Sequence, residues 1–104
     1  TDAPQQFSVP GFSVHREMES MAAAGLQPYD ILRSGTLAVG EHFRARDTFG
    51  SIAPGHRADA VLLDANPLAS ITNFQRQSGV LLRGRWLPAS EIKSRLAEIA
   101  VRNR

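Results

Sequence analysis

Residues 50–68 read GSIAPGHRADAVLLDANPL, and this stretch decides how the rest of the chain is interpreted. It holds a Pro54–Gly55 turn, then an apolar run from Ala60 to Asp64, and it is closed by Asn66–Pro67. A short continuous apolar run that is rich in branched residues and bounded by turn signals is typical of a buried β-strand. We therefore expect a strand over residues 60–64.

A second apolar run, GVLLRGRWL, spans residues 79–87 and predicts a second strand. The intervening ASITNFQRQS matches neither the helix nor the strand pattern, and we expect Ile71 and Phe74 to be its buried side chains. Two strands alone make a marginal sheet, and both runs are apolar on both faces, as strands inside a larger sheet are. We infer that the rest of the sheet comes from another copy of the chain or from a preceding polypeptide.

Three short helices are predicted ahead of the first strand, after a loop over residues 1–12. Apolar side chains recur at spacings of three and four from Ser13, which is the expected N-cap, and Gly25 supplies a left-handed end. The second helix begins at Pro28 and ends at Gly35. The third follows with Thr36 as its expected cap.

The segment PASEIKSRLAEIAVRNR predicts a C-terminal amphipathic helix. Glu91–Arg95 and Glu98–Arg102 are favourable pairs four residues apart. Trp86 is expected to be partly exposed. The predicted buried core comprises Ile31, Leu32, Val61, Leu63, Leu81, Ile92, Leu96 and Ile99.

Composition narrows the class of protein. The chain has 104 residues, enough for one domain, and no cysteine, which excludes disulfides, thiolate zinc sites and cysteine nucleophiles. No apolar run approaches the ~20 residues of a membrane span, so we expect a cytoplasmic protein without a membrane partner. The net charge is +2 and the pI about 9.9, but the arginines are scattered beside acids, so a nucleic-acid partner is not expected.

The histidines do not form a recognisable site. His15, His42 and His56 lie too far apart for the paired spacing of metal ligands. We expect His15 at the entry of the first helix, His42 as partly buried packing and His56 in an exposed turn. Serine-elbow and phosphate-loop patterns are both absent. On spacing alone, the sequence predicts no active site.

The series of segments nevertheless resembles the C-terminal quarter of the metal-dependent amidohydrolases. Residues 50–68 are similar to that family's G-s-I-x-P-G-k-x-A-D-l-v-l-l-d-x-n-P-l stretch, and AGLQPYDILRSGT to its a-G-l-t-p-x-e-a-L-x-x-x-T stretch. The imidazolonepropionase- and prolidase-like branch is the closest in these motifs. The resemblance runs from Thr1 to about Leu87, with the last helix as an extension.

The resemblance implies an α+β fragment of a larger enzyme. Residues 1–48 would form the end of strand eight and the last helices of a (β/α)₈ barrel. Residues 49–104 would form strands of a small β-sandwich, built from both chain termini, plus a C-terminal helix. The chain would then begin where the last barrel strand ends, and its strands would find their partners at the other end of the parent.

The resemblance also implies site residues. Asp2 would ligate a divalent metal, usually zinc, and act as general base toward a metal-bound water, and His15 could face the substrate. The family's other metal ligands are not in this chain, so we expect no metal in the chain alone and no activity. The parent would hydrolyse a C–N bond in a small amide, a cyclic amide or a dipeptide.

Two other hypotheses remain open. The unpaired apolar strands also suit a stand-alone structural or interaction module that oligomerises, with no catalysis. A weak nucleic-acid binder that uses the arginine-rich end ranks last, and it predicts a steep salt dependence of binding.

Overall fold

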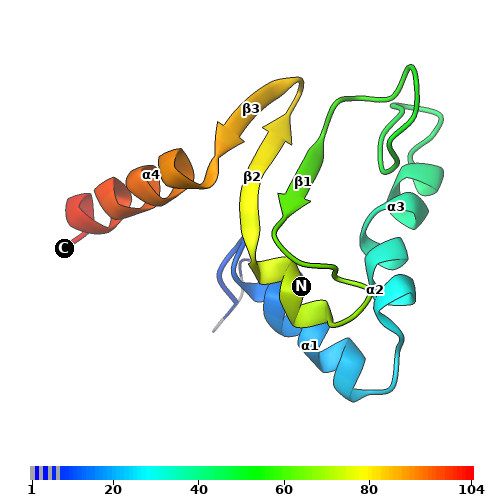
Figure 1. The fold of residues 1–104 in the computed structure, drawn as a ribbon, viewed down its shortest axis with the longest axis horizontal. Helices are drawn as coiled ribbons and strands as arrows, with labels where there is room; N and C mark the ends of the chain where they lie inside the picture. Colours follow the sequence, from blue (N-terminus) through cyan, green and yellow to red (C-terminus); the bar gives the residue numbers. More distant parts are fainter. Residues whose placement is uncertain (1, 3, 5, 7) are drawn as a thin grey trace.

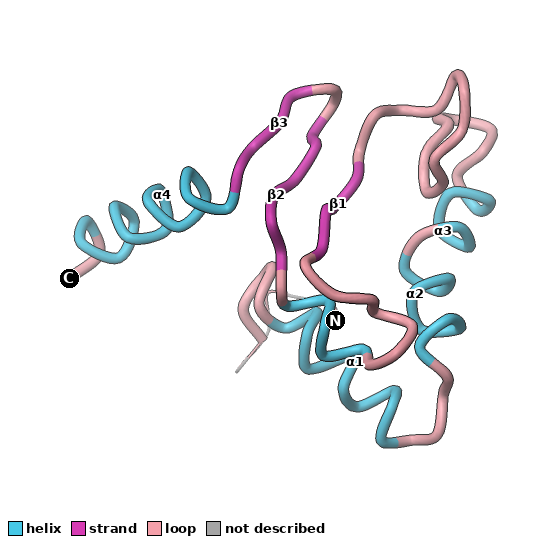
Figure 2. Tube along the Cα trace, viewed as in Figure 1, coloured by secondary structure: helices cyan, strands magenta, loops and turns pink. Residues whose placement is uncertain are grey.

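The computed structural model describes residues 2, 4, 6 and 8–104, so the predicted loop over residues 1–12 lies partly outside the described residues. Within this part of the chain, three helices lie beside a three-stranded antiparallel sheet, and a fourth helix projects from the sheet (Figure 1, Figure 2). The elements are α1 (Ser13–Ala23), α2 (Pro28–Gly35), α3 (Leu37–His42), β1 (Ala60–Leu63), the 3₁₀ helix η1 (Ile71–Gln75), β2 (Gln77–Leu82), β3 (Arg85–Pro88) and α4 (Ala89–Arg102).

The turn after α1 follows from the glycine at its end. Gly25 has a φ of 97°, and its N–H donates to the carbonyl of Ala22 at 3.0 Å. The N–H of Leu26 donates to the carbonyl of Met21 at 3.1 Å. These two bonds form a Schellman motif, which confirms the predicted helix end. Pro28 occupies the first turn of α2, also as predicted.

Both predicted side-chain N-caps are wrong. α1 starts after Phe12, so Ser13 lies in its first turn, and the enclosed Oγ of Ser13 has no hydrogen-bond partner among the described residues. Thr36 does precede α3, but its hydroxyl donates to the carbonyl of Leu32 at 2.7 Å. Because α3 follows α2 directly, the threonine satisfies the end of α2 instead of the start of α3.

The sheet has the order β1-β2-β3, so the prediction of a single strand over residues 79–87 is wrong. That run folds into a hairpin in which Leu81 pairs with Trp86. Arg83 and Gly84 close it with φ values of 49° and 80°. Positive φ at both turn positions suits a two-residue turn whose twist matches that of the strands. In the three-stranded sheet of the described residues, β1 pairs with β2 and forms one edge.

The segment between β1 and β2 connects the sheet to α1. η1 contacts both α1 and β1. Ile71 is only 6% exposed and Phe74 is half-buried, in line with their prediction as buried points. On the outer side, the Gln75 Nε2 donates to Glu19 Oε1 at 2.7 Å.

α4 contacts β2 and β3 near its start and then extends beyond the sheet (Figure 1). The predicted Glu91–Arg95 pair is present, at 2.9 Å. Ile92 is half-buried, but Leu96 and Ile99 are 45% and 51% exposed. Their prediction as core residues is therefore wrong, because the helix outruns the sheet that would cover it.

The buried hydrophobic core is small. Among the described residues, Ile31 and Ile71 are the hydrophobic side chains that are fully buried. Leu32, Leu63 and Leu81 are half-buried, and Val61, predicted to be core, is 40% exposed. Trp86 is 47% exposed, as predicted.

The molecule exposes more surface than a compact protein of its size. Its accessible surface is 7897 Å², whereas a folded monomer of 11.3 kDa is expected to expose about 5,700 Å². The radius of gyration is 15.0 Å against an expected value of about 13 Å. None of the described helices has the length and apolar character needed to cross a membrane.

Candidate functional site

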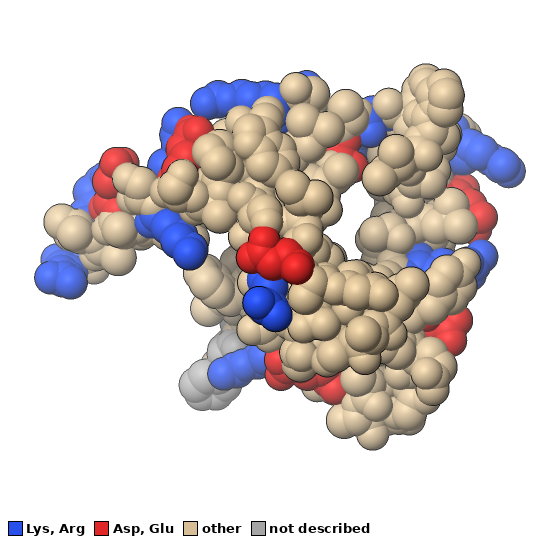
Figure 3. All heavy atoms as spheres, in the orientation of Figure 1, with Lys and Arg blue, Asp and Glu red and all other residues tan. Residues whose placement is uncertain are grey.

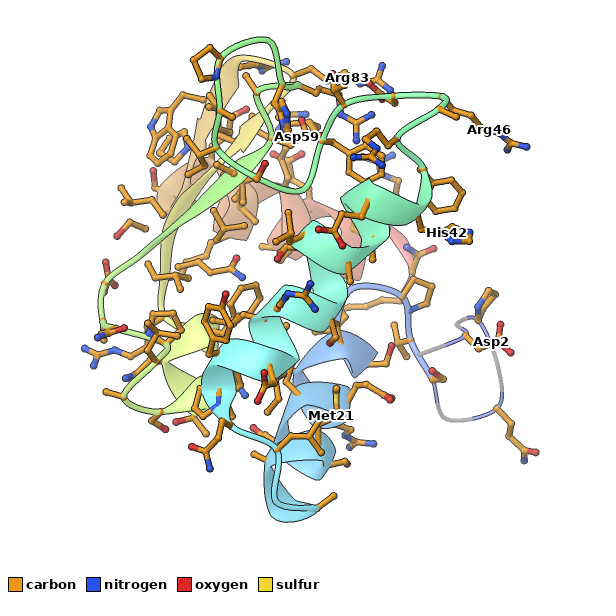
Figure 4. The ribbon with its side chains drawn as sticks, turned by 90° about the vertical axis from the view of Figure 1, so that its right-hand side faces the viewer. Asp2, Met21, His42, Arg46, Asp59 and Arg83 are labelled. Atoms are coloured by element: carbon orange, nitrogen blue, oxygen red, sulfur yellow. The ribbon has the colours of Figure 1, made fainter. Side chains whose placement is uncertain are left out.

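Asp2, the predicted metal ligand and general base, lies in the segment before α1. Its side chain is exposed, and its φ of 46° is in the left-handed region, which Asp tolerates better than most residues. Figure 4 shows Asp2 well apart from Asp59 and Arg83. The catalytic and metal-binding roles of Asp2 stay predictions.

The described residues do not fit a metal ion by themselves. No group of three His, Asp or Glu side chains in this part of the chain is placed to hold one. A catalytic zinc takes three protein ligands, of which Asp2 would supply at most one. Any metal bound through Asp2 therefore requires further ligands from outside the described residues.

The three histidines occupy separate environments. The His15 ring lies 5.9 Å from the Phe74 ring, and its enclosed Nδ1 has no hydrogen-bond partner among the described residues. His42 is exposed (Figure 4), so its prediction as partly buried packing is wrong. His56, predicted in an exposed turn, is half-buried, with its Nδ1 3.1 Å from Ser51 Oγ. His15 thus contributes to packing between α1 and η1, and its predicted contact with substrate stays a prediction.

The sequence reasoning noted that the arginines lie beside acids, but it missed a cluster around Arg57. Its Nη1 pairs with Asp47 Oδ2, its Nε pairs with Asp59 Oδ2 at 2.5 Å, and its guanidinium carbon lies 4.7 Å from the centre of the Phe49 ring. The N–H of Arg57 also donates to the carbonyl of Thr48 at 2.7 Å. Asp59 is two residues from Arg57, but Asp47 is ten residues away. Neither the helix period nor the strand period predicts that residues at this separation are close in space.

Asp59 joins this cluster to the β2–β3 hairpin. Its Oδ1 accepts the N–H of Arg83 at 2.8 Å, and the N–H of Gly84 donates to the carbonyl of Ala58 at 3.0 Å. The Arg83 N–H, and then the Arg57 side chain, hold the pKa of the Asp59 carboxyl below its usual range. Both oxygens of the Asp59 carboxylate accept hydrogen bonds, so this side chain holds the loop before β1 to the hairpin.

The loop between α3 and β1 is further fixed by two glycines. Gly50 has a φ of 91°, and a Cβ there would come within 3.2 Å of the Cα of Gly40. Thr48 Oγ1 donates to the carbonyl of Gly55 at 3.1 Å. The loop carries Ile52 with 94% of its surface exposed. A well-bonded loop therefore presents a large apolar side chain to solvent.

A hollow of about 520 Å³ lies between the sheet and α2–α3 (Figure 3). Thr36, Ser51 and Asp59 are the polar or charged residues in its lining. The larger apolar residues around it are Leu32, Ile52, Val61, Leu63, Phe74, Val80, Leu81 and Leu82. The arrangement suits an apolar occupant better than a charged ligand, because few polar groups converge on the space.

Comparisons with known proteins point to one family. The model of the amidohydrolase family matches residues 1–87. A solved structure from a study titled "Structural and catalytic characterization of molinate hydrolase" is similar, with 35% sequence identity and a TM-score of 0.66. That similarity covers 71% of this chain and 16% of the molinate hydrolase chain, so this chain spans about a sixth of that protein. A search of curated proteins gave no match.

Proposed function

The chain belongs to the amidohydrolase family, and we propose that it is the C-terminal part of a metal-dependent hydrolase acting on C–N bonds, inactive alone. The observation that carries this proposal is the family match over residues 1–87. The motifs of residues 50–68 favour the imidazolonepropionase- and prolidase-like branch. In the proposed parent, α1 to α3 are the last helices of the barrel and β1 to β3 belong to the small β-sandwich.

The uncovered sheet supports a larger parent. Strand pairing places Leu62 and Trp86 on one face, and Val61 and Leu82 on the other. Their exposed fractions are 56%, 47%, 40% and 52%, respectively. A sheet whose two faces both carry exposed large apolar residues normally has covering layers on both sides. We infer that these layers lie in the parent polypeptide.

We propose Asp2 as the metal ligand and catalytic residue that this chain contributes. A bound divalent metal would supply Lewis-acid activation in such an enzyme, and the remaining ligands would come from outside this chain. The part of Asp2 is to offer a carboxylate oxygen and to hold a proton during hydrolysis. His15 is retained as a proposed substrate contact, in addition to its packing against Phe74.

The substrate class proposed for the parent is a small amide, a cyclic amide or a dipeptide. Molinate is the substrate named for the similar hydrolase, and it belongs in the same assay panel. The localisation that we propose is cytoplasmic.

The test starts with the intact mass of the protein in its native source, detected through α4. A species of several hundred residues is expected, and it should contain bound metal and hydrolyse a member of the panel. In that protein, Asp2→Asn should lower kcat/KM by at least about 100-fold. Asp30→Asn, which changes another exposed acid, is the matched control and should leave it within about twofold. A longer protein without metal and without hydrolysis would refute the proposal.

The alternative is a stand-alone module that oligomerises without catalysis. The same exposed apolar residues favour it, because a second copy would also cover them. It predicts a native species near 11.3 kDa that forms dimers or larger oligomers in solution. A native species of several hundred residues would exclude it.

A further inference from the structure

We propose that α4 is a peripheral membrane-binding helix, which lies flat in the surface of a bilayer that contains anionic phospholipid. The family match ends at residue 87, so α4 lies beyond the part of the chain that the family describes. The lack of a spanning run led to the expectation of no membrane partner, but a helix that lies in the surface needs no such run. The inference goes beyond hydrolysis and does not depend on it.

The first observation is the apolar stripe of α4. Ile92, Leu96 and Ile99 follow one another at spacings of four and three, so they share one face of the helix. Ile92 is half-buried. Leu96 and Ile99 are 45% and 51% exposed, on the part of the helix that projects beyond the sheet (Figure 1). The described residues therefore leave most of this stripe uncovered.

The second observation is the arrangement of charge around the stripe. The helix period places Lys93 on one border of the stripe, and Arg95 and Arg102 on the other. Arg95 pairs with Glu91 at 2.9 Å, whereas Lys93 and Arg102 form no ion pair among the described residues. Glu98 lies further round the helix, away from the stripe. Cations on both borders suit an interfacial helix, because they reach the headgroups while the apolar side chains enter the acyl boundary.

The third observation is the distribution of charge along the chain. Residues 83–104 contain six Lys or Arg and two Glu, a net charge of +4. Residues 1–82 contain six Arg and eight Asp or Glu, a net charge of −2. Figure 3 shows Lys and Arg side chains along α4 and over the hairpin, at the left and upper left of the view. An anionic surface would therefore attract this end of the molecule and orient α4 toward the lipid.

Other occupants suit the stripe less well. A second copy of α4 would bring like charges together along both borders, whether the two helices ran parallel or antiparallel. Nucleic acid would set its phosphates against exposed leucine and isoleucine side chains at the centre of the contact. A helix of 14 residues is about 21 Å long, and its stripe is small beside the about 800 Å² that each partner buries in a standard protein interface.

The test is co-sedimentation of the native protein with two kinds of vesicle. One kind is phosphatidylcholine alone, and the other contains equal parts of phosphatidylcholine and phosphatidylserine. At about 0.1 M salt, the partition coefficient should be at least about 100-fold higher on the anionic vesicles, since each unpaired cation near an anionic surface contributes about fivefold. Salt at about 1 M should remove most of this difference.

Two groups of substitutions separate the charge from the apolar stripe. Replacing Lys93, Arg102 and Arg104 together by glutamine should lower binding to the anionic vesicles by about 100-fold. Leu96→Ser combined with Ile99→Ser should lower it by at least about tenfold. All five side chains are exposed, so circular dichroism should show unchanged helix content.

Each group has a matched control. Replacing Arg16, Arg44 and Arg46 by glutamine removes the same charge from exposed positions outside α4, and it should change binding by about threefold or less. Val101→Ser alters an α4 side chain that is 66% exposed but lies away from the stripe, and it should change binding by about twofold or less.

Three outcomes would overturn the inference. The first is equal sedimentation with the two kinds of vesicle. The second is a loss in the control arginine variant as large as that in the α4 variant. The third is binding that follows the cations alone and ignores the Leu96 and Ile99 substitutions, as a general attraction to anions or a nucleic-acid site would give.

This inference and the proposed function fail separately. Vesicle binding is measured without metal or substrate and reports only on α4. A native protein that binds anionic vesicles but neither holds metal nor hydrolyses the panel would refute the hydrolase alone. An active hydrolase that does not sediment with anionic vesicles would refute the membrane-binding helix alone.

Discussion

Replacing Gly40 by alanine should destabilise the protein, whereas the same replacement at Gly35 should not. Gly40 lies buried in α3, against the loop that leads to β1. A Cβ at this position would overlap the carbonyl oxygen of Phe49 and lie 3.0 Å from its carbonyl carbon and 3.3 Å from the Cα of Gly50. All of these neighbours are backbone atoms, so no side-chain rotation relieves the overlap.

The magnitude follows from two opposing effects. The Phe49 carbonyl must retreat by about 1 Å, an overpacking change that costs about 3 kcal/mol at the upper end of its usual range. Alanine in place of glycine within a helix returns about 1 kcal/mol. The net loss at Gly40 is therefore about 2 kcal/mol. At Gly35, where no described atom lies within 4 Å of the added Cβ, only the gain of up to about 1 kcal/mol remains.

Urea unfolding followed by circular dichroism measures the two free energies of unfolding. The variants should differ by about 3 kcal/mol, which is a factor of about 100 in the unfolding equilibrium constant. Gly50→Ala should resemble Gly40→Ala, because a Cβ there would approach the carbonyl carbon of Thr36 at 3.1 Å and the φ of Gly50 is 91°. A Gly40→Ala variant as stable as Gly35→Ala would refute the close packing of the loop on α3.

Three further predictions concern acid stability, the core and the hairpin. The pKa of Asp59 is lowered in the folded protein, so its contribution to stability is complete above the unfolded pKa of about 4 and is lost as the pH falls through the lower folded pKa. In Asp59→Asn, the urea midpoint should therefore decline less steeply as the pH falls below about 5. An unchanged pH profile would contradict this role. Ile31→Ala should cost about 2–5 kcal/mol because this side chain is 2% exposed, whereas Leu96→Ala, at 45% exposed, should cost about 1 kcal/mol or less; similar losses would show that the core is misplaced. In Gly79→Ala, the added methyl group meets the ring of Trp86, which can turn away, and the backbone carbonyl oxygen of Leu87 at 2.8 Å, which cannot. We therefore expect a shift in tryptophan fluorescence with a loss of about 1–3 kcal/mol; unchanged emission would indicate that the ring does not lie over Gly79.

The helices could be predicted because their signals are local. Apolar spacing, the first-turn position of Pro28 and the left-handed Gly25 fixed three of them near their observed bounds. The hairpin was missed because its turn uses Arg83 where asparagine or aspartate is usual, so the run reads as continuous. The cap at Thr36 failed because the spacing alone did not show that α3 follows α2 without a break, and the cap at Ser13 failed because α1 starts directly after Phe12.

The errors in burial have a different origin. Val61 was predicted to be buried from its place in an apolar run, and the structure leaves 40% of it exposed. An apolar run indicates that a strand is suited to be covered on both faces. The exposed fraction reports only the covering elements that these 104 residues supply. The Arg57 cluster was missed because its partners come from a loop, where no period brings Asp47 near.

The chain combines a well-ordered surface with little burial of apolar side chains. The Arg57 cluster, the glycine contact and the Asp59–Arg83 bond fix a surface in detail, yet the side chains that this surface presents, Ile52 above all, remain exposed. Hydrogen bonds and ion pairs define shape but supply little net stability, which comes mainly from apolar burial. A surface that is well shaped and poorly buried is therefore suited to be completed by another polypeptide. Asp2 lies apart from this surface (Figure 4), so assembly and the proposed chemistry can be perturbed one at a time.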